Sequence, residues 1–327
     1  MKKNIALVTG GLSAEAIISY KSVITVEQNI DSSKFNIYKI DICKDGWFYE
    51  ESNSAKRSIV NKSDFTININ GSTIFFDAVL MCIHGTPGED GILQGYFDLL
   101  KIPYTTCNAA SSSLTFNKRY TVAVAAFSGI SVAKSFHLFK QDTINISQIL
   151  TEISLPVFVK PNNGGSSIGM SKVMKEDDLE DAIQKAFNED KQVLIEEFIE
   201  GREFTIGVYK SKGKIIALPI TEVISKKDFF DYEAKYLGFS EEVTPAQISN
   251  SITEQIQSTA IKIYQIFNCN GVVRIDFIYN EKLMKPFMLE INTVPGQSAA
   301  SIIPQQVKAS GMNLKEFYTL LIEECFS

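Results

Sequence analysis

Two short strand-like runs carry four polar side chains that could bind a metal ion and an anion. The first run, VVRIDF, contains Arg274 and Asp276, and the second, FMLEIN, contains Glu290 and Asn292. Because side chains alternate faces along a strand, each pair shares one face. Two carboxylates and an amide oxygen are hard ligands that suit Mg²⁺ bound together with nucleotide phosphates, and an adjacent arginine can neutralise an anion. The alternative is a solvent-facing hairpin surface, which the apolar residues of both runs disfavour.

A second candidate is the glycine-rich stretch KPNNGGSSIGM, which begins with Lys160 at the end of an apolar run. Such a loop allows backbone amides to approach phosphates closely while the lysine adds positive charge. The stretch also fits the G-x-S-x-G pattern of serine hydrolases. That chemistry needs a histidine after the serine, and the two histidines, His84 and His137, both precede it. Phosphate binding is therefore the better interpretation, without a Walker A sequence, which the chain lacks.

Two further segments suggest parts of a nucleotide site. Residues 193–204, VLIEEFIEGREF, end an apolar run with acidic groups that could accept hydrogen bonds from an adenine amine and ribose hydroxyls; a solvated turn is an equal alternative. Residues 229–237, FFDYEAKYL, gather aromatic side chains without helical or strand periodicity. Such a stretch favours a lid that closes over a ligand, and a buried loop or an irregular helix is the alternative.

The elements that position these residues divide into three parts. Before about residue 116, β-rich runs alternate with helical segments, which is typical of a parallel sheet wrapped by helices. Strands are expected there at 4–9, 36–41 and 77–83, with a hairpin turn at Asn70–Gly71. Between 117 and 200, a strand at 156–160, a helix at 177–188 and a strand at 192–198 predict a small α+β unit. Beyond 200, hairpins with turns at Lys212–Gly213 and Asn280–Glu281 dominate, beside a helix near 252–267.

Composition narrows the class of partner. The 327 residues carry a net charge of -6, which gives no basic field for nucleic acid or an anionic membrane, so a small-molecule substrate is favoured. No apolar stretch approaches the roughly 20 residues that span a bilayer. The five cysteines are odd in number and contain no CxxC pair, which indicates reduced thiols in a cytosol.

Taken together, these motifs resemble the D-alanine-D-alanine ligase family, and they occur in the family's order from Gly10 to Pro304. The matching stretches are GGLSAE from Gly10, HG at His84 with GEDG from Gly88, the loop from Lys160 to Met170, residues 231–236, and NTVPG from Asn292. The resemblance implies an α/β fold in which an N-terminal open parallel-sheet, Rossmann-like domain precedes a two-lobed ATP-grasp α+β fold. The implied domains are 1–116 for substrate binding, 117–200 for the central lobe, and 201–327 for the lobe with the metal and substrate site.

By the same resemblance, the chain joins two D-alanines into D-alanyl-D-alanine through a D-alanyl phosphate, for peptidoglycan precursor synthesis. ATP is a substrate that yields ADP and phosphate, and two Mg²⁺ or Mn²⁺ ions assist. The implied protein is a cytoplasmic homodimer with no nucleic acid or membrane partner.

The family's site residues map onto this sequence in four groups. Catalytic positions are Glu15, Ser166, Tyr236, Arg274, Gly296 and Ser301. ATP-binding positions are Lys118, Lys160, Ser167, Glu196, Glu197, Phe198, Ile199, Glu203 and Lys235. Amino-acid substrate positions are Glu15, His84, Lys235, Ser301 and Ile302, where a hydrogen-bonded loop histidine is an equal interpretation of His84. Metal positions are Asp276, Glu290 and Asn292.

The chain departs from the family pattern at three places. Phe198 stands where many relatives carry tryptophan, Ala16-Ile17 replaces a charged pair, and residues 297–300 differ beside the second-substrate pocket. The acceptor is thus less determined than the reaction, although the Glu-Ala-Lys-Tyr loop resembles dipeptide formers more than D-lactate-using relatives. Two alternatives stay open: an ATP-grasp ligase with another acceptor, and a catalytically silent nucleotide-binding protein, which the retained metal ligands and Arg274 disfavour.

Overall fold

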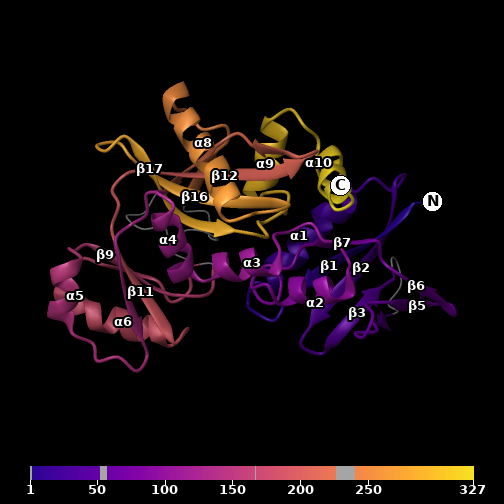
Figure 1. Cartoon of the computed structure of the whole chain (residues 1–327), viewed down its shortest axis with the longest axis horizontal. Coiled ribbons are helices and arrows are strands. Elements are labelled where there is room, and N and C mark those ends of the chain that lie inside the picture. Colours follow the sequence, from indigo (N-terminus) through magenta and orange to yellow (C-terminus); the bar gives the residue numbers. More distant parts are fainter. Residues whose placement is uncertain (1, 52–56, 166, 226–239) are drawn as a thin grey trace.

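The computed structural model describes residues 2–51, 57–165, 167–225 and 240–327, and Figure 1 shows three sheet-containing parts. Its helices are α1 (Ala16–Asn29), α2 (Ile92–Leu100), α3 (Ala109–Phe116), α4 (Lys118–Phe127), α5 (Ile146–Glu152), η1 (Glu176–Asp178), α6 (Leu179–Phe187), α8 (Asn250–Ile266), α9 (Ile302–Ala309) and α10 (Leu314–Glu324). Its strands are β1 (Lys3–Gly10), β2 (Phe35–Cys43), β3 (Gly46–Glu50), β4 (Arg57–Ile59), β5 (Ile67–Ile69), β6 (Ser72–Ile74), β7 (Ala78–Met81), β8 (Ser135–Phe139), β9 (Val157–Pro161), β10 (Ser171–Val173), β11 (Gln192–Glu197), β12 (Arg202–Ser211), β13 (Lys214–Ala217), β14 (Thr221–Ser225), β15 (Ser240–Val243), β16 (Val272–Asn280) and β17 (Lys285–Asn292).

The N-terminal sheet has the strand order β4-β3-β2-β1-β7. The three strands predicted from the sequence form its parallel part, since β1 pairs in parallel with both β2 and β7. A short antiparallel extension, β3 and β4, follows β2. Only two residues connect β2 to β3, and a connection that short cannot cross over to make a parallel pair. The predicted hairpin around Asn70–Gly71 is confirmed as β5 and β6.

The central part is an antiparallel sheet in the order β10-β9-β11-β8 with α5 and α6 on one face. Helix α6 buries Leu179, Ala182, Ile183 and Ala186, which is the spacing of one face of an α-helix. Lys160 and Glu196 lie on the other face of this sheet, away from α5 and α6.

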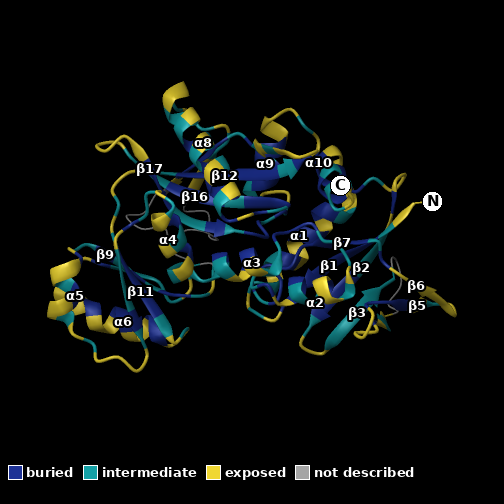
Figure 2. Ribbon diagram, in the orientation of Figure 1, coloured by how far each residue is buried: buried dark blue, intermediate teal, exposed yellow. Residues whose placement is uncertain are grey.

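The C-terminal sheet, in the order β15-β14-β12-β16-β17, joins the other two parts. Helix α8 packs on one face with residues of α4 (Ala125) and its following loop (Ile130). On the other face, Tyr209, Val272, α9 and α10 share a core with Ile5, Leu7 and Val23 of the N-terminal part. In Figure 2, β12 and β16 are coloured mostly as buried, whereas α8 carries many exposed residues. In the described ranges, no helix has the length and apolarity to cross a bilayer.

The hairpin β16–β17 turns at residues 281–284, later than the predicted Asn280–Glu281. Asn280 explains the difference, because its side-chain oxygen accepts a hydrogen bond from the Leu283 N–H at 2.8 Å and closes a longer turn. The predicted hairpin in residues 201–220 is found as β12 and β13, with the turn at Lys212–Gly213 as expected.

Candidate active site

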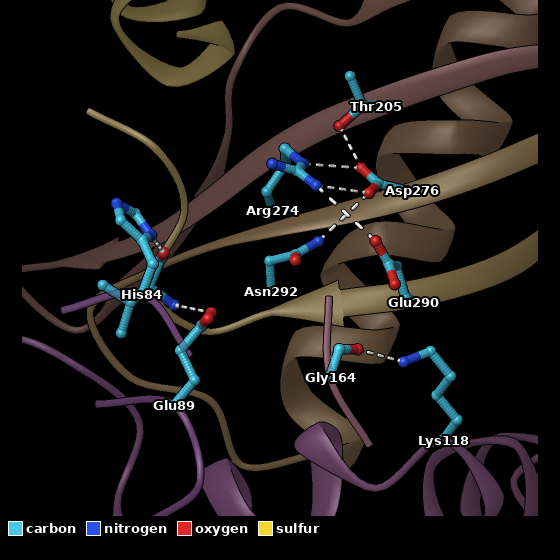
Figure 3. Close-up of polar contacts among 10 residues, drawn as sticks. His84, Glu89, Lys118, Gly164, Thr205, Arg274, Asp276, Glu290 and Asn292 are labelled. Atoms are coloured by element: carbon cyan, nitrogen blue, oxygen red, sulfur yellow. Dashed lines mark hydrogen bonds and ion pairs between the residues drawn. The ribbon is translucent and has the colours of Figure 1, made fainter. Parts of the chain in front are cut away.

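The hairpin β16–β17 brings the four polar side chains of the two strand runs onto one face. Arg274 lies opposite Asn292, and Asp276 lies opposite Glu290. A β-bulge follows directly, because Phe277 pairs with Met288 and leaves Leu289 as the extra residue. Bulges re-aim the side chains of one strand. The predicted shared face is therefore confirmed, and all four side chains are close together in Figure 3.

Asp276 is the centre of this cluster. Arg274 donates from Nε to Oδ1 at 2.9 Å and from Nη2 to Oδ2 at 2.7 Å. Thr205 on β12 donates to Oδ1, and Asn292 donates from Nδ2 to Oδ2 at 3.2 Å. Burial lowers the pKa of Arg274, but the charges of Asp276 and Glu290 outweigh burial and raise it. The arginine therefore stays a cation, and its remaining N–H groups are available to an anion.

A cavity of about 480 Å³ lies between the central and C-terminal sheets. Eight of the predicted ATP-binding residues line it, namely Lys118, Lys160, Ser167, Glu196, Glu197, Phe198, Ile199 and Glu203. Apolar side chains complete its walls: Phe158, Ile168, Met170, Val223, Ile278 and Leu289. Lys160 forms an ion pair with the buried Glu196. A cavity of this size, with apolar walls beside charged groups, suits a nucleotide.

A second cavity, of about 310 Å³, adjoins the first. Predicted residues on its walls are Glu15, His84, Arg274, Asn292, Gly296, Ser301 and Ile302. Lys118, Gly164, Gly165 and Glu290 line both cavities. Lys118 donates from Nζ to the Gly164 carbonyl at 2.5 Å, and burial lowers its pKa (Figure 3). A group bound at the end of one cavity would thus meet a group bound in the other.

The Glu15 carboxylate lies between two glycines from different parts of the chain. A Cβ atom added to Gly85 would come within 2.5 Å of Glu15 Oε2, and one added to Gly165 within 2.7 Å of Oε1. Both positions therefore leave room for the carboxylate only because they lack a side chain. Glu15 faces the second cavity, where it can accept hydrogen bonds from an ammonium group.

His84 is buried, as the interpretation of a hydrogen-bonded loop histidine requires, and it also lines the second cavity. Its Nδ1 lies 2.6 Å from the Val294 carbonyl and its Nε2 lies 2.9 Å from Ser22 Oγ. Since a carbonyl only accepts, Nδ1 carries the proton. Burial lowers the pKa of His84 to about 4, so the ring is neutral near pH 7.

Some residues of the site carried no assignment from sequence. Glu89 accepts from the Gly85 N–H at 2.7 Å and the Val294 N–H at 3.1 Å. Glu89 belongs to the GEDG run that matches the family, but nothing in the sequence assigned it a role in the site. Thr205 and Ser22 had no such signal, because their partners come from distant segments. Lys21, which lines the second cavity, had none either. Ser166, Lys235, Tyr236 and the predicted lid lie outside the described residues.

The donor set of the hairpin fits a hard divalent cation. Asp276, Glu290 and Asn292 supply only oxygen ligands from adjacent strands, as Mg²⁺ requires. Glu290 is the accessible member, with 35% of its side chain exposed and its Oε1 4.0 Å from Arg274 Nη2. The Asp276 oxygens accept from four donors, so a cation would displace at least one of them.

The comparisons with known proteins cover nearly the whole chain and all point to one family. The family model described as the D-ala D-ala ligase N-terminus matches residues 4–107, and that of the C-terminus matches 117–323. The D-alanine–D-alanine ligase of Flavobacterium johnsoniae is 46% identical over 98% of both chains. Among solved structures, the VanG D-Ala:D-Ser ligase of Enterococcus faecalis has a TM-score of 0.89 at 31% identity, covering 99% of this chain and 100% of that one. D-alanyl-alanine synthetase A of Vibrio cholerae has a TM-score of 0.88 at 28% identity, covering 99% and 98%. With these matches, and with both cavities lined by the family's motif residues, the chain belongs to the D-alanine-D-alanine ligase family.

Proposed function

We propose that this protein joins two D-alanines in an ATP-dependent reaction that forms D-alanyl-D-alanine, ADP and phosphate for peptidoglycan precursor synthesis. The observation that carries the proposal is the junction of the two cavities at Lys118, Gly164, Gly165 and Glu290. A nucleotide in the apolar cavity would present its terminal phosphate at this junction. An amino acid held at Glu15 would present its carboxylate there from the other side.

In the first half-reaction, a carboxylate oxygen of the first D-alanine attacks the γ-phosphorus, and the bond from that phosphorus to the β-phosphate oxygen breaks. ADP leaves, and a D-alanyl phosphate remains. Lys118 and Lys160 offset negative charge on the phosphates, while Glu15 holds the ammonium group. Phosphoryl transfer depends mainly on such positioning and charge compensation.

In the second half-reaction, the amine of the second D-alanine, having lost a proton, attacks the acyl carbon. The carbon–oxygen bond to phosphate then breaks, inorganic phosphate leaves, and the attacking nitrogen gives up its excess proton to phosphate or water. Arg274 and the Gly296 N–H stabilise the negative charge on the tetrahedral oxygen. Ser301 and Ile302 hold the carboxylate of the second substrate, with Lys235. By the family resemblance, Ser166 and Tyr236 also have catalytic roles.

Asp276, Glu290 and Asn292 would hold two Mg²⁺ or Mn²⁺ ions. Such ions, when bound, neutralise charge that develops on the transferring phosphoryl group. Arg274 compensates the charge of Asp276, and the second carboxylate, Glu290, leaves this face with a net negative charge that suits a cation.

We further propose the domain division 1–116, 117–200 and 201–327, a homodimeric assembly and a cytoplasmic location. Burial of Cys82, Cys107 and Cys269 as free thiols supports a reducing compartment. Because the D-Ala:D-Ser ligase of E. faecalis is a near structural relative, D-serine is the second candidate acceptor.

The deciding experiment is phosphate release from ATP and Mg²⁺ with D-alanine, L-alanine, D-serine or D-lactate, with the products identified by mass. The proposal expects D-alanyl-D-alanine as the main product and no turnover with L-alanine. A mixed product with D-serine in the second position would change the acceptor. ATP binding without any product would indicate the silent nucleotide-binding alternative.

A further inference from the structure

One segment of the amino-acid cavity, Val294 to Gln297, is held by hydrogen bonds from the N-terminal part of the molecule. The segment follows β17 and contains Gly296, whose backbone lines the cavity. The Val294 carbonyl accepts from His84 Nδ1 at 2.6 Å. The Gln297 N–H donates to Ser22 Oγ at 3.1 Å. The two ends of the segment are thus attached to a histidine and a serine that are themselves bonded to each other at 2.9 Å.

Each hydrogen-bonding group in this arrangement has one consistent role. His84 Nδ1–H donates to the carbonyl, so Nε2 of the neutral ring accepts. The Ser22 hydroxyl then donates to Nε2, and its oxygen accepts from the Gln297 N–H. Ser19 Oγ accepts from the His84 N–H at 3.0 Å and fixes the backbone from which the ring projects.

The surroundings make the arrangement rigid. Ser22 and Ser19 are fully buried on α1, His84 is 6% exposed, and Gln297 is 5% exposed. On the far side, Tyr318 of α10 donates to Gln297 Oε1 at 3.2 Å. Buried hydrogen bonds without competing water hold their geometry better than exposed ones.

We propose that Ser22 and His84 are positioning residues, which fix the backbone around Gly296 so that its N–H meets the oxyanion of the second half-reaction. The inference deepens the proposed function and rests on it. Neither side chain needs to transfer a proton, because the role is geometric. A donor displaced by about 1 Å loses on the order of 100-fold in rate, so the expected effect is large for residues that need not touch the reacting atoms.

The test compares Ser22→Ala with Ser112→Ala, which removes another fully buried serine hydroxyl, located on α3, that donates to the Cys107 carbonyl. Ser22→Ala should lower kcat by about 10- to 100-fold, with the KM for ATP changed less than about twofold. A phosphinate analogue of the dipeptide, which mimics the tetrahedral state, should lose affinity by the same factor as kcat. Ser112→Ala should leave kcat and the affinity for the analogue near wild type.

His84→Asn completes a double-mutant cycle, because asparagine keeps an N–H near the Nδ1 position but removes the acceptor for Ser22. The double variant should lose little more than Ser22→Ala alone, since both changes break the same link. The pH profile of kcat should keep its shape in every variant. The inference would be overturned if the kcat losses of the two single variants multiplied in the double variant. It would also be overturned by a Ser22→Ala effect no larger than that of Ser112→Ala, or by a shifted pH profile.

The failure of the proposed function would be seen separately. It would appear as wild-type protein that releases no D-alanine-dependent phosphate. In that case, the same four variants would be compared by their unfolding midpoints, and additive midpoint shifts would overturn the Ser22–His84 link as well.

Discussion

The two cavities of the site differ in how they are built. The larger cavity, which we assign to the nucleotide, is lined by apolar and charged side chains that come mainly from strands, among them the Lys160–Glu196 ion pair. The smaller cavity, which we assign to the amino acids, takes its charged and polar side chains from loops, helices and strands of distant segments. Glu15, for example, faces both Gly85 and Gly165. We therefore expect the first cavity to tolerate changes of shape better than the second, which depends on the relative placement of distant segments.

This difference has an energetic origin. Apolar walls bind by removing area from water, which is non-directional, so losing one wall residue should cost a limited part of the affinity. Charged groups in a partly buried cavity act over fixed distances and angles, so losing one leaves its partners uncompensated. Substitutions should therefore have larger effects where charge is handled, and the following predictions test this in order of expected size.

Glu290→Gln should have the largest effect, because Glu290 lines both cavities. Turnover should fall by about 100- to 1000-fold, since a neutral amide cannot replace a carboxylate metal ligand during phosphoryl transfer. Glu281→Gln, in the exposed turn of the same hairpin, is the control. Steady-state kinetics and Mn²⁺ titration calorimetry would measure turnover and metal affinity. Activity within about threefold of wild type would reject the metal assignment.

Glu15→Gln should act mainly on the first amino acid. The KM for D-alanine at the first site should rise by about 10- to 100-fold, because the carboxylate forms a charge-assisted contact with the ammonium group. The KM for ATP should change little, since Glu15 lines only the amino-acid cavity. A change confined to the ATP constant would show that the two cavities are wrongly assigned.

Phe198→Ala should have a smaller effect, confined to the nucleotide. The ring lies 5.9 Å from that of Phe158, and Lys172 Nζ lies 4.2 Å from its centroid. Losing this apolar wall should weaken binding of a non-hydrolysable ATP analogue by about 3- to 10-fold. Phe198→Trp, which restores the residue many relatives carry, should bind at least as well as wild type. Calorimetry measures the affinity of both variants for the analogue. A rise in the KM for D-alanine instead would contradict the assignment of the two cavities to different substrates.

Glu89→Gln should alter the pH dependence of stability. Burial and the charge of Glu15 raise the pKa of Glu89 to about 8, against two backbone N–H donors. Between the unfolded value and pH 8, the folded state keeps a proton that the unfolded chain releases, so this contribution to stability is lost as pH rises. Between pH 6.5 and 8, the free energy of unfolding of the variant should fall less than that of wild type, by on the order of 1 kcal/mol.

Urea unfolding of the ligand-free protein measures this slope. The measurement begins at pH 6.5 because His84, whose pKa is lowered to about 4, makes stability rise with pH below that value, opposite to Glu89. The stability that the neutral His84 ring contributes is present above the pKa of histidine in the unfolded chain and is lost as pH falls. Parallel curves for wild type and Glu89→Gln would mean that Glu89 is ionised in the folded protein.

Much of the nucleotide side could be predicted from the sequence because its signals are local. Strand alternation placed Arg274 with Asp276 and Glu290 with Asn292, and the structure adds only the register and the bulge. The small residues after Lys160 indicated a phosphate loop from composition alone. Both inferences depend on periodicity and residue type over a few positions, which the chain itself carries.

The amino-acid side was decided by tertiary structure. From sequence, Glu15, His84 and Gly296 were known only through resemblance, and Ser22 and Glu89 had no role. Their contacts join residues far apart in the chain, 275 positions for Ser22 with Gln297 and 205 for Glu89 with Val294. The core that brings them together, from α1 and β1 to α10, forms only when the N-terminal and C-terminal sheets pack against each other. Local patterns determine which face of a strand is polar, but the partner of a loop residue depends on the packing of whole sheets, which no short stretch of sequence encodes.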